Sequence, residues 1–528
     1  MNKLPIGIQS FEDLRNNQYI YVDKTALIWS MITEGKSYFL SRPRRFGKSL
    51  LVSTIAAYFL GQKDLFQGLM IAEKESEKPS EEQWLAYPVM VFSLSGGTYL
   101  KSEGLESQLT KEIKRAEQQY LGESVKGQDD TIASWFGKVI EALYAKEHRQ
   151  VVVLVDEYDK PLLETMNFNT EQEEENRALF KSFFSVLKDE DQYLKFVFFT
   201  GVTKFSKVSI FSDLNQLNDI SMSTKYTALC GITQEELLAC FKDNISALAH
   251  TQGIEWDEAI QKLTRMYDGY HFSESPVGVY NPFSILNAFS NCKYGRYWFE
   301  TGTPTFLIRE LNRWNKPVQD FTDGVRAKQA RLSDYRAHNP DLVPLYYQTG
   351  YLTITGYDPQ FDEYTLSYPN DEVKYGYLES LIPVIAPGVQ SPDDSFSASR
   401  MTGYLKNGDT DSFMKMLQAL LASIPYYEGK APEQEQQWRN IIYAVFAVLG
   451  QYVTAEVHSA RGRSDCIVEN ENHVYIFEFK MNESAEAALK QIEETGYAEP
   501  YLASGKRIIK IGVNISDKKG TIDEWLIA

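Results

Sequence analysis

The chain has 528 residues, a length that predicts about two to four domains. Hydrophobic residues make up 43% and charged residues 24%, so each domain can bury a core, which argues against a mainly disordered protein. The formal net charge of −18 argues against a protein that coats nucleic acid through its overall charge, because phosphate groups would be repelled at long range.

The cysteine content and the apolar runs bear on the cellular compartment. The chain has four cysteines and no CxxC pair, which argues against a zinc site or a disulfide framework and fits a reducing cytoplasm. The N-terminal stretch has no apolar signal core. The longest apolar run, residues 441–453, is too short to span a bilayer and is interpreted as a buried helix. We therefore expect a cytoplasmic protein with no membrane contact.

Buried strands alternate with helices along the first 230 residues. Apolar runs predict strands at 37–40, 88–95, 151–159 and 194–203. Apolar and amphipathic helices are predicted between them, including a long one at 102–120. This alternation indicates an α/β fold with a parallel sheet.

The rest of the chain divides into two regions. Residues 230–400 have a weaker strand pattern and predict a mostly helical region with a local hairpin at 343–358. From residue 401 the pattern predicts two helices, consecutive strands with turns at 461–463 and 469–473, a helix at 484–497 and a strand at 507–516. We expect three domains, with bounds at 1–285, 286–400 and 401–528.

The string RPRRFGKSLL at 42–51 follows a predicted strand and opens a predicted helix, as a phosphate-binding loop does. In such a loop Lys48 reaches the β- and γ-phosphates, Ser49 holds Mg²⁺, and Gly47 lets the backbone approach the ligand. The residues predicted to bind the nucleotide here are Arg42, Arg45, Phe46, Gly47, Lys48 and Ser49. Arg42 replaces the first glycine of the usual motif, and GKS alone is also compatible with an ordinary exposed loop.

Two acids end the predicted strand at 151–159. In P-loop ATPases this position places one carboxylate near Mg²⁺, here Asp156, and the next near the attacking water, here Glu157. Thr200, at the end of the following strand, is a candidate sensor of the γ-phosphate. Solvated acids at a strand end are the alternative, but the order and spacing of both features favour nucleotide hydrolysis.

A second group of chemistry-bearing residues lies in GRSDCIVENENHVYIFEFK near the C-terminus. Glu478 and Lys480 are two residues apart in one predicted strand, so their side chains share a face, and a hairpin would bring Asp465 beside them. Carboxylates of this kind hold Mg²⁺ or Mn²⁺, and a lysine orients water or stabilises negative charge during phosphodiester hydrolysis. Glu435 is a candidate further metal ligand, and Gln491 could position substrate or water. A charged stripe on an exposed hairpin is the alternative.

The chain resembles a known family in both regions. YVDKT at 21–25, RPRRFGKSLL at 42–51, VVLVDEYDKP at 152–161, FTGVTKFSKVSIFSDLNQLNDIS at 199–221 and YDGYHF at 267–272 resemble AAA-ATPase-like proteins. GRSDCIVE, VYIFEFK, ALKQIEETGYAEPY and IIKIGVNIS resemble the PD-(D/E)xK nuclease superfamily.

The resemblance implies an AAA-like P-loop domain, a helical middle region and a restriction-endonuclease-like α/β domain. It implies phosphate and Mg²⁺ roles for Lys48 and Ser49, and it supports Arg42 because the family shares that substitution. It also implies Asp156 and Glu157 as the acidic pair of the P-loop site. The nuclease set that it implies is Asp465, Glu478 and Lys480, with Glu435 as the helix acid.

These observations lead to two hypotheses. The first is an ATP-binding and ATP-hydrolysing protein coupled to a nuclease that needs Mg²⁺ or Mn²⁺, with nucleic acid as its partner. The second is a nucleotide-dependent switch that binds a protein or nucleic acid through a non-cleaving nuclease fold. The sequence does not distinguish DNA from RNA, and it leaves a homo-oligomer open.

Overall fold

The computed structural model describes residues 3–101, 103–165, 169–204, 214, 216–301, 321, 324–332, 341–385, 398–423, 431–450, 454–460 and 463–528. Only the backbone is described at 383–385, 431–437, 454–460 and 463–465. The chain forms two compact units: an N-terminal unit of Met1–Trp298 with Val325–Asn370, and a C-terminal unit of Phe299–Gly324 with Asp371–Ala528.

A five-stranded sheet with all strands parallel is the centre of the N-terminal unit. Its order is β2-β3-β4-β1-β5, with bounds β1 Ser37–Ser41, β2 Val89–Ser93, β3 Val151–Asp156, β4 Leu194–Gly201 and β5 Asn218–Asp219. The four longer strands are those that the apolar runs predict. Because helices cover both faces, the middle residues of these strands are mostly apolar, and β3 is buried along its whole length. The two-residue β5 has too short a pattern to be predicted.

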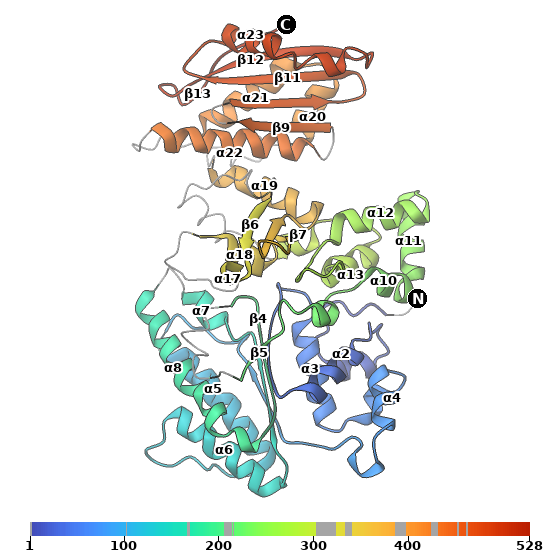
Figure 1. The fold of residues 1–528 in the computed structure, drawn as a ribbon, viewed down its shortest axis with the longest axis vertical. Coiled ribbons are helices and arrows are strands. Elements are labelled where there is room, and N and C mark those ends of the chain that lie inside the picture. The colour runs from blue at the N-terminus through green and yellow to red at the C-terminus, as the bar shows by residue number, and fades with distance from the viewer. Residues whose placement is uncertain are drawn as a thin grey trace. The chain divides into compact units, whose positions relative to one another are not determined.

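Helices lie on both sides of this sheet. Figure 1 shows α5, α6 and α8 on one side and α2, α3 and α4 on the other. The helices of this part of the unit are α1 Phe11–Asn16, α2 Thr25–Glu34, α3 Lys48–Phe59, α4 Met70–Ser76, α5 Glu103–Ala116, α6 Ile132–Glu147, α7 Lys160–Thr165 and α8 Thr170–Asp189.

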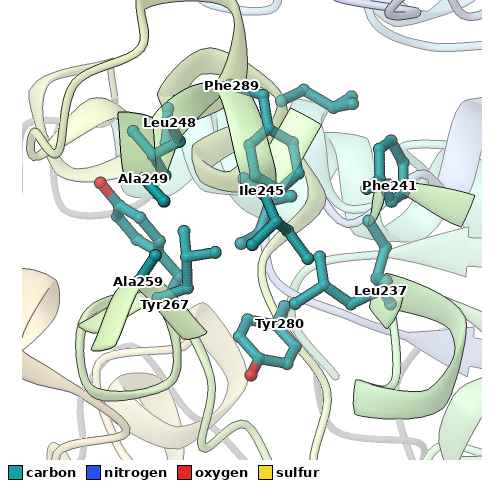
Figure 2. Close-up of a cluster of buried hydrophobic side chains, with 14 residues drawn as sticks. Leu237, Phe241, Ile245, Leu248, Ala249, Ala259, Tyr267, Tyr280 and Phe289 are labelled. Atoms are coloured by element: carbon teal, nitrogen blue, oxygen red, sulfur yellow. The ribbon is translucent and has the colours of Figure 1, made fainter. Parts of the chain in front are cut away.

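The chain then enters the predicted helical region. Its first helices are α10 Gln234–Cys240, α11 Lys242–Gln252, α12 Trp256–Tyr267, α13 Pro282–Asn291 and α14 Tyr297–Thr301. Figure 2 shows that side chains from α10 to α13, with Tyr280, meet in one apolar core. Residues of the N-terminal extended segment, such as Leu4 and Ile20, also pack against that core.

The hairpin prediction at 343–358 was wrong in its position. Residues Val343–Thr349 form helix α18, since Pro344 suits the first turn of a helix and Gly350 ends it at φ 89°. The hairpin follows instead, as β7 Thr353–Asp358 and β8 Glu363–Ser367. A third strand, β6 Val325–Lys328, pairs with β8, and α17 Gln329–Leu332 follows it.

The C-terminal unit is a mixed sheet with helices. Its strands are β9 Thr454–Ala460, β10 Arg463–Glu469, β11 His473–Met481, β12 Arg507–Ser516 and β13 Thr521–Ile527, in the order β13-β12-β11-β10-β9. Only β11 and β12 are parallel, and helix α23, Ala485–Thr495, connects them. The other helices are α19 Asp371–Ile385, α20 Ala398–Lys406, α21 Thr410–Ala422 and α22 Ala431–Leu449. This arrangement agrees with the predicted α/β unit, to which β13 is an addition.

The apolar run at 441–453 begins inside α22, whose residues from Ile441 to Leu449 are mostly buried. Across the described ranges, no helix combines the length and the apolar character needed to cross a bilayer. None of the four cysteines forms a disulfide.

Candidate functional sites

The loop between β1 and α3 contains two residues with a left-handed backbone. Arg45 and Gly47 both take left-handed conformations, with φ of 68° and 89°. A side chain at Gly47 would meet no atom within 4 Å, so the space beside the loop is open. Helix α3 starts at Lys48, and its first N–H groups therefore lie at the end of this loop.

Lys48 is held within the loop itself. Its Nζ donates hydrogen bonds of 2.9 Å to the carbonyl oxygens of Arg42 and of Pro43, and the residue is only 7% exposed. Burial lowers the pKa of the Lys48 amine, and the nearby Asp156 carboxylate opposes that shift. An anion that entered the loop would give this buried cation a stronger partner than two neutral carbonyls.

The side chains of Arg42 and Phe46 anchor the loop to other parts of the unit. The Arg42 guanidinium is buried and donates to three carbonyl oxygens, those of Ser41, Ser221 and Tyr226. It also lies 4.1 Å from the centroid of the Phe272 ring.

The Phe46 ring packs edge-on against Tyr270 and Phe272. The YDGYHF string thus supplies the aromatic base of the loop. Arg45 is exposed, with its guanidinium 4.6 Å from the centroid of the Phe283 ring.

The acids that follow β3 lie close to the loop. Burial raises the pKa of the Asp156 carboxyl, and the nearby Ser49 hydroxyl and Lys48 amine oppose that shift. Among the described residues, none hydrogen-bonds to Asp156 Oδ1. A buried carboxylate oxygen beside a serine hydroxyl fits Mg²⁺, a hard cation that takes oxygen ligands.

Glu157 has an unusual backbone for a glutamate, with a left-handed φ of 55°. Burial and the neighbouring Asp156 raise the pKa of its carboxyl. Thr200 is fully buried near the end of β4, level with Leu40 of β1. No described residue bonds to its Oγ1. Thr200 therefore lies on β4, which stands between β1, the strand before the loop, and β3, the strand that leads to the two acids.

One residue of this region was missed by the sequence analysis. Asp159, the last acid of VDEYD, is 1% exposed and accepts hydrogen bonds from Val202 N, Thr203 N and Thr203 Oγ1. Its presence in a string that already carried two acids predicted for the site was the available signal.

In the C-terminal unit, Glu478 and Lys480 share one face of β11, as their spacing predicts. Lys480 Nζ lies 3.8 Å from Glu478 Oε1, with the Glu478 side chain fully buried and the Lys480 side chain 12% exposed. The antiparallel register pairs Asp465 of β10 directly with Glu478. The side chains of Asp465 and Glu435 lie outside the described residues, so the full predicted metal set stays a prediction. In the part of the chain whose side chains are described, no cluster of three metal-ligating residues occurs.

Helix α23 adds Gln491 to this group. Lys480 Nζ donates a 2.5 Å hydrogen bond to Gln491 Oε1. Gly512 of β12 lets the helix lie this close, because a Cβ there would lie 2.8 Å from Leu489 N and closer still to Ala485 O. The pair of Lys480 and Gln491 thus depends on close packing of α23 against the sheet.

Comparison with known proteins agrees with both halves of the fold. Residues 5–211 match the family described as "Predicted AAA-ATPase", and residues 433–525 match the PD-(D/E)XK nuclease superfamily. The chain is also similar to the "Uncharacterized protein in vnfD 5'region" of Azotobacter chroococcum mcd 1. The two are 37% identical over 530 residues, which cover 97% of this chain and 96% of the relative.

The fold and the two residue groups therefore define a nucleotide-hydrolase and nuclease type of architecture. The chain belongs to the family of AAA-ATPase-like proteins with a C-terminal PD-(D/E)XK nuclease-superfamily domain.

Proposed function

We propose that this protein binds and hydrolyses ATP and uses that cycle to control a metal-dependent nuclease. One observation carries the proposal: a single chain holds two separate groups suited to phosphate chemistry. In the first group, at the end of the parallel sheet, the Asp156 carboxyl acts electrostatically on the buried Lys48 amine. In the second group, in the mixed sheet, Lys480 Nζ lies 3.8 Å from Glu478 Oε1.

In the first group, the loop N–H groups and Lys48 bind the phosphates, and Lys48 exchanges its two carbonyl partners for phosphate oxygens. Ser49 and Asp156 would hold Mg²⁺, and the bound ion would neutralise charge that develops on the phosphates. Glu157 orients the attacking water, and the Thr200 hydroxyl donates to the γ-phosphate. Arg42, Arg45 and Phe46 belong to this nucleotide-binding loop, where Arg42 and Phe46 also fix its backbone.

In the second group, Asp465, Glu478 and Glu435 would hold Mg²⁺ or Mn²⁺, and the bound ion would supply a more acidic water and polarise the phosphodiester. Lys480, oriented by Gln491, positions that water or stabilises the negative charge of the transition state. The proposed substrate is nucleic acid, DNA or RNA.

Control by the nucleotide fits the charge of the chain. A net charge of −18 opposes unassisted binding of nucleic acid, so a gated nuclease suits this chain better than one that is always active. The corresponding domains are an ATPase domain at 1–285, a helical middle region at 286–400 and a nuclease domain at 401–528.

A cleavage screen tests the nuclease half. Single- and double-stranded DNA and RNA are incubated with the protein and Mn²⁺, with and without ATP. Wild type is expected to cut at least one form, and Lys480→Ala to lose that activity while folding normally. Lys490→Ala, which changes an exposed lysine on the neighbouring helix α23, is the matched control and is expected to behave as wild type.

No cleavage of any form by wild type would contradict the nuclease. If ATP nevertheless bound and changed the oligomeric state, the switch hypothesis would replace it.

A further inference from the structure

The end of β3 holds an acid that the proposed chemistry does not use. Asp159 lies two residues after Glu157 and is almost completely buried. Its Oδ2 accepts three hydrogen bonds: 3.0 Å from Val202 N, 2.6 Å from Thr203 N and 2.8 Å from Thr203 Oγ1. These three hydrogen bonds to one oxygen fix the turn that follows β4.

The other Asp159 oxygen lies close to the backbone of the same turn. A Cβ at Gly201 would be 2.5 Å from Asp159 Oδ1 and 2.7 Å from a ring carbon of Tyr158. Tyr158 holds the same segment, because its N–H donates to Thr200 O at 3.1 Å and its hydroxyl to Thr203 O at 2.8 Å. Tyr158 and Asp159 together therefore fasten the end of β3 to residues 200–203.

The two residues proposed to act on the nucleotide, Glu157 and Thr200, lie next to these contacts. Glu157 immediately precedes Tyr158 and has the left-handed φ of 55°, which an L residue keeps only where its surroundings determine it. On its other side, Asp156 O accepts from Leu94 N at 3.1 Å, so the backbone is fixed before and after Glu157. Thr200 immediately precedes Gly201, the residue that lies against Tyr158 and Asp159, and its carbonyl oxygen accepts the hydrogen bond from Tyr158 N.

We infer that Asp159 is a positioning residue for ATP hydrolysis, which fixes Glu157 and Thr200 relative to each other without touching the nucleotide. The inference rests on the proposed ATPase function. A position error of about 1 Å in such groups costs on the order of 100-fold in rate. A residue that only stabilised the fold would change the unfolding temperature and leave the turnover of folded molecules intact.

The test measures kcat and KM for ATP hydrolysis, with thermal unfolding as the fold control. Asp159→Asn leaves one acceptor oxygen, which is a weaker acceptor than a carboxylate oxygen, and puts an NH₂ group in place of the other, so kcat is expected to fall roughly 10- to 100-fold while KM stays within about twofold. Asp189→Asn makes the same change at an exposed site before β4 and is expected to match wild type.

A second pair of variants remains informative if Asp159→Asn does not fold. Thr203→Val removes the hydroxyl donor to Asp159 and leaves both backbone donors, so a smaller fall in kcat is expected. Thr203→Ser keeps the hydroxyl and is expected to restore kcat. Faster hydrogen exchange at the Val202 and Thr203 amides in Thr203→Val, but not in Thr203→Ser, would support the same geometry.

Equal kcat in wild type and in a folded Asp159→Asn or Thr203→Val would overturn the inference and leave the ATPase intact. A rise in KM with unchanged kcat would also overturn it. Wild type that binds ATP without hydrolysing it would remove the ATPase function, and the inference with it.

Discussion

At the scale of single residues, Asp156 is a buried acid of the proposed nucleotide site, and burial disfavours its charged form. Burial raises the pKa of this carboxyl above its ordinary 3.8, so between 3.8 and the raised value the folded protein binds more protons than the unfolded chain. Its stability therefore falls as the pH rises through that window. Asp156→Asn removes the penalty and is expected to stabilise the nucleotide-free protein at pH 7 by on the order of 1 kcal/mol, at the expense of Mg²⁺-dependent nucleotide binding.

Chemical unfolding of wild type and Asp156→Asn between pH 4 and 8 measures this difference. Asp130 supplies a control of opposite sign, because hydrogen bonds from Lys138 and the Gly127 N–H lower the pKa of its carboxyl to about 2. That stabilisation is complete above pH 3.8 and is lost as the pH falls towards 2, so Asp130→Asn is expected to be less stable than wild type at pH 7. An Asp156→Asn variant less stable than wild type would contradict the account.

The sequence predicted some site residues better than others, for a physical reason. Lys48 and Asp156 follow from patterns that are local in the chain, a loop before a helix and acids after a strand. The contacts of Arg42 do not, because two of its carbonyl partners belong to Ser221 and Tyr226, 179 and 184 residues away. Asp159 was missed for the same reason, since its partners lie 43 and 44 residues further along the chain.

At the scale of secondary structure, the close packing of α23 on the C-terminal sheet brings Gln491 within hydrogen-bonding distance of Lys480, in the proposed nuclease site. Gly512→Ala places a Cβ against the backbone of α23, where no rotamer change can relieve the clash. We expect a loss of about 1–3 kcal/mol in unfolding free energy, typical of overpacking, and reduced cleavage because Gln491 moves away from Lys480.

Gly403→Ala is the matched control in the same unit. Gly403 lies inside α20, and a Cβ there would meet no atom within 4 Å. The change is expected to be neutral or to stabilise by about 0.5–1 kcal/mol, because alanine is the better helix former. Urea unfolding and the cleavage assay measure both variants; equal stability of the two would show that α23 does not need the glycine.

Secondary structure was predictable where the apolar residues of an element follow one dominant repeat along the sequence. Strands β1 to β4 each contain a short run of apolar residues, and α23 has a clear amphipathic pattern that ends at Gly496 in the left-handed region. The hairpin prediction at 343–358 was wrong for residues 343–349 because a short apolar and aromatic run fits a strand as well as a buried helix. Pro344 and Gly350, as helix start and stop signals, should have decided between them.

At the scale of the whole molecule, the two groups should be separable by mutation. Lys48→Ala removes the buried cation of the loop and is expected to weaken ATP binding about 10- to 100-fold, as the loss of a charged hydrogen-bonding partner does. Under the proposed control, nucleic-acid cleavage by this variant no longer responds to ATP, while its basal rate without ATP equals that of wild type. Lys63→Ala, an exposed lysine of the same unit, is the control. ATP titration measures the affinity for ATP, and cleavage assays with and without ATP measure the response of the nuclease. An unchanged ATP response in Lys48→Ala would show that ATP bound at this loop does not control cleavage.

The charge of the whole chain makes one further prediction about metal ions. With a net charge of −18, the protein repels nucleic acid at long range, so a divalent ion between the acids of the nuclease group and a phosphate must contribute much of the attraction. Binding of a fluorescent oligonucleotide to the cleavage-deficient Lys480→Ala variant is therefore expected to tighten by about tenfold or more when Mn²⁺ replaces EDTA. Glu478→Gln in the same background weakens the metal site and should remove most of that gain, whereas an exposed change such as Glu494→Gln should not. Tight binding in EDTA would instead indicate a basic surface that binds the oligonucleotide without metal. It would contradict the prediction that a divalent ion supplies much of the attraction.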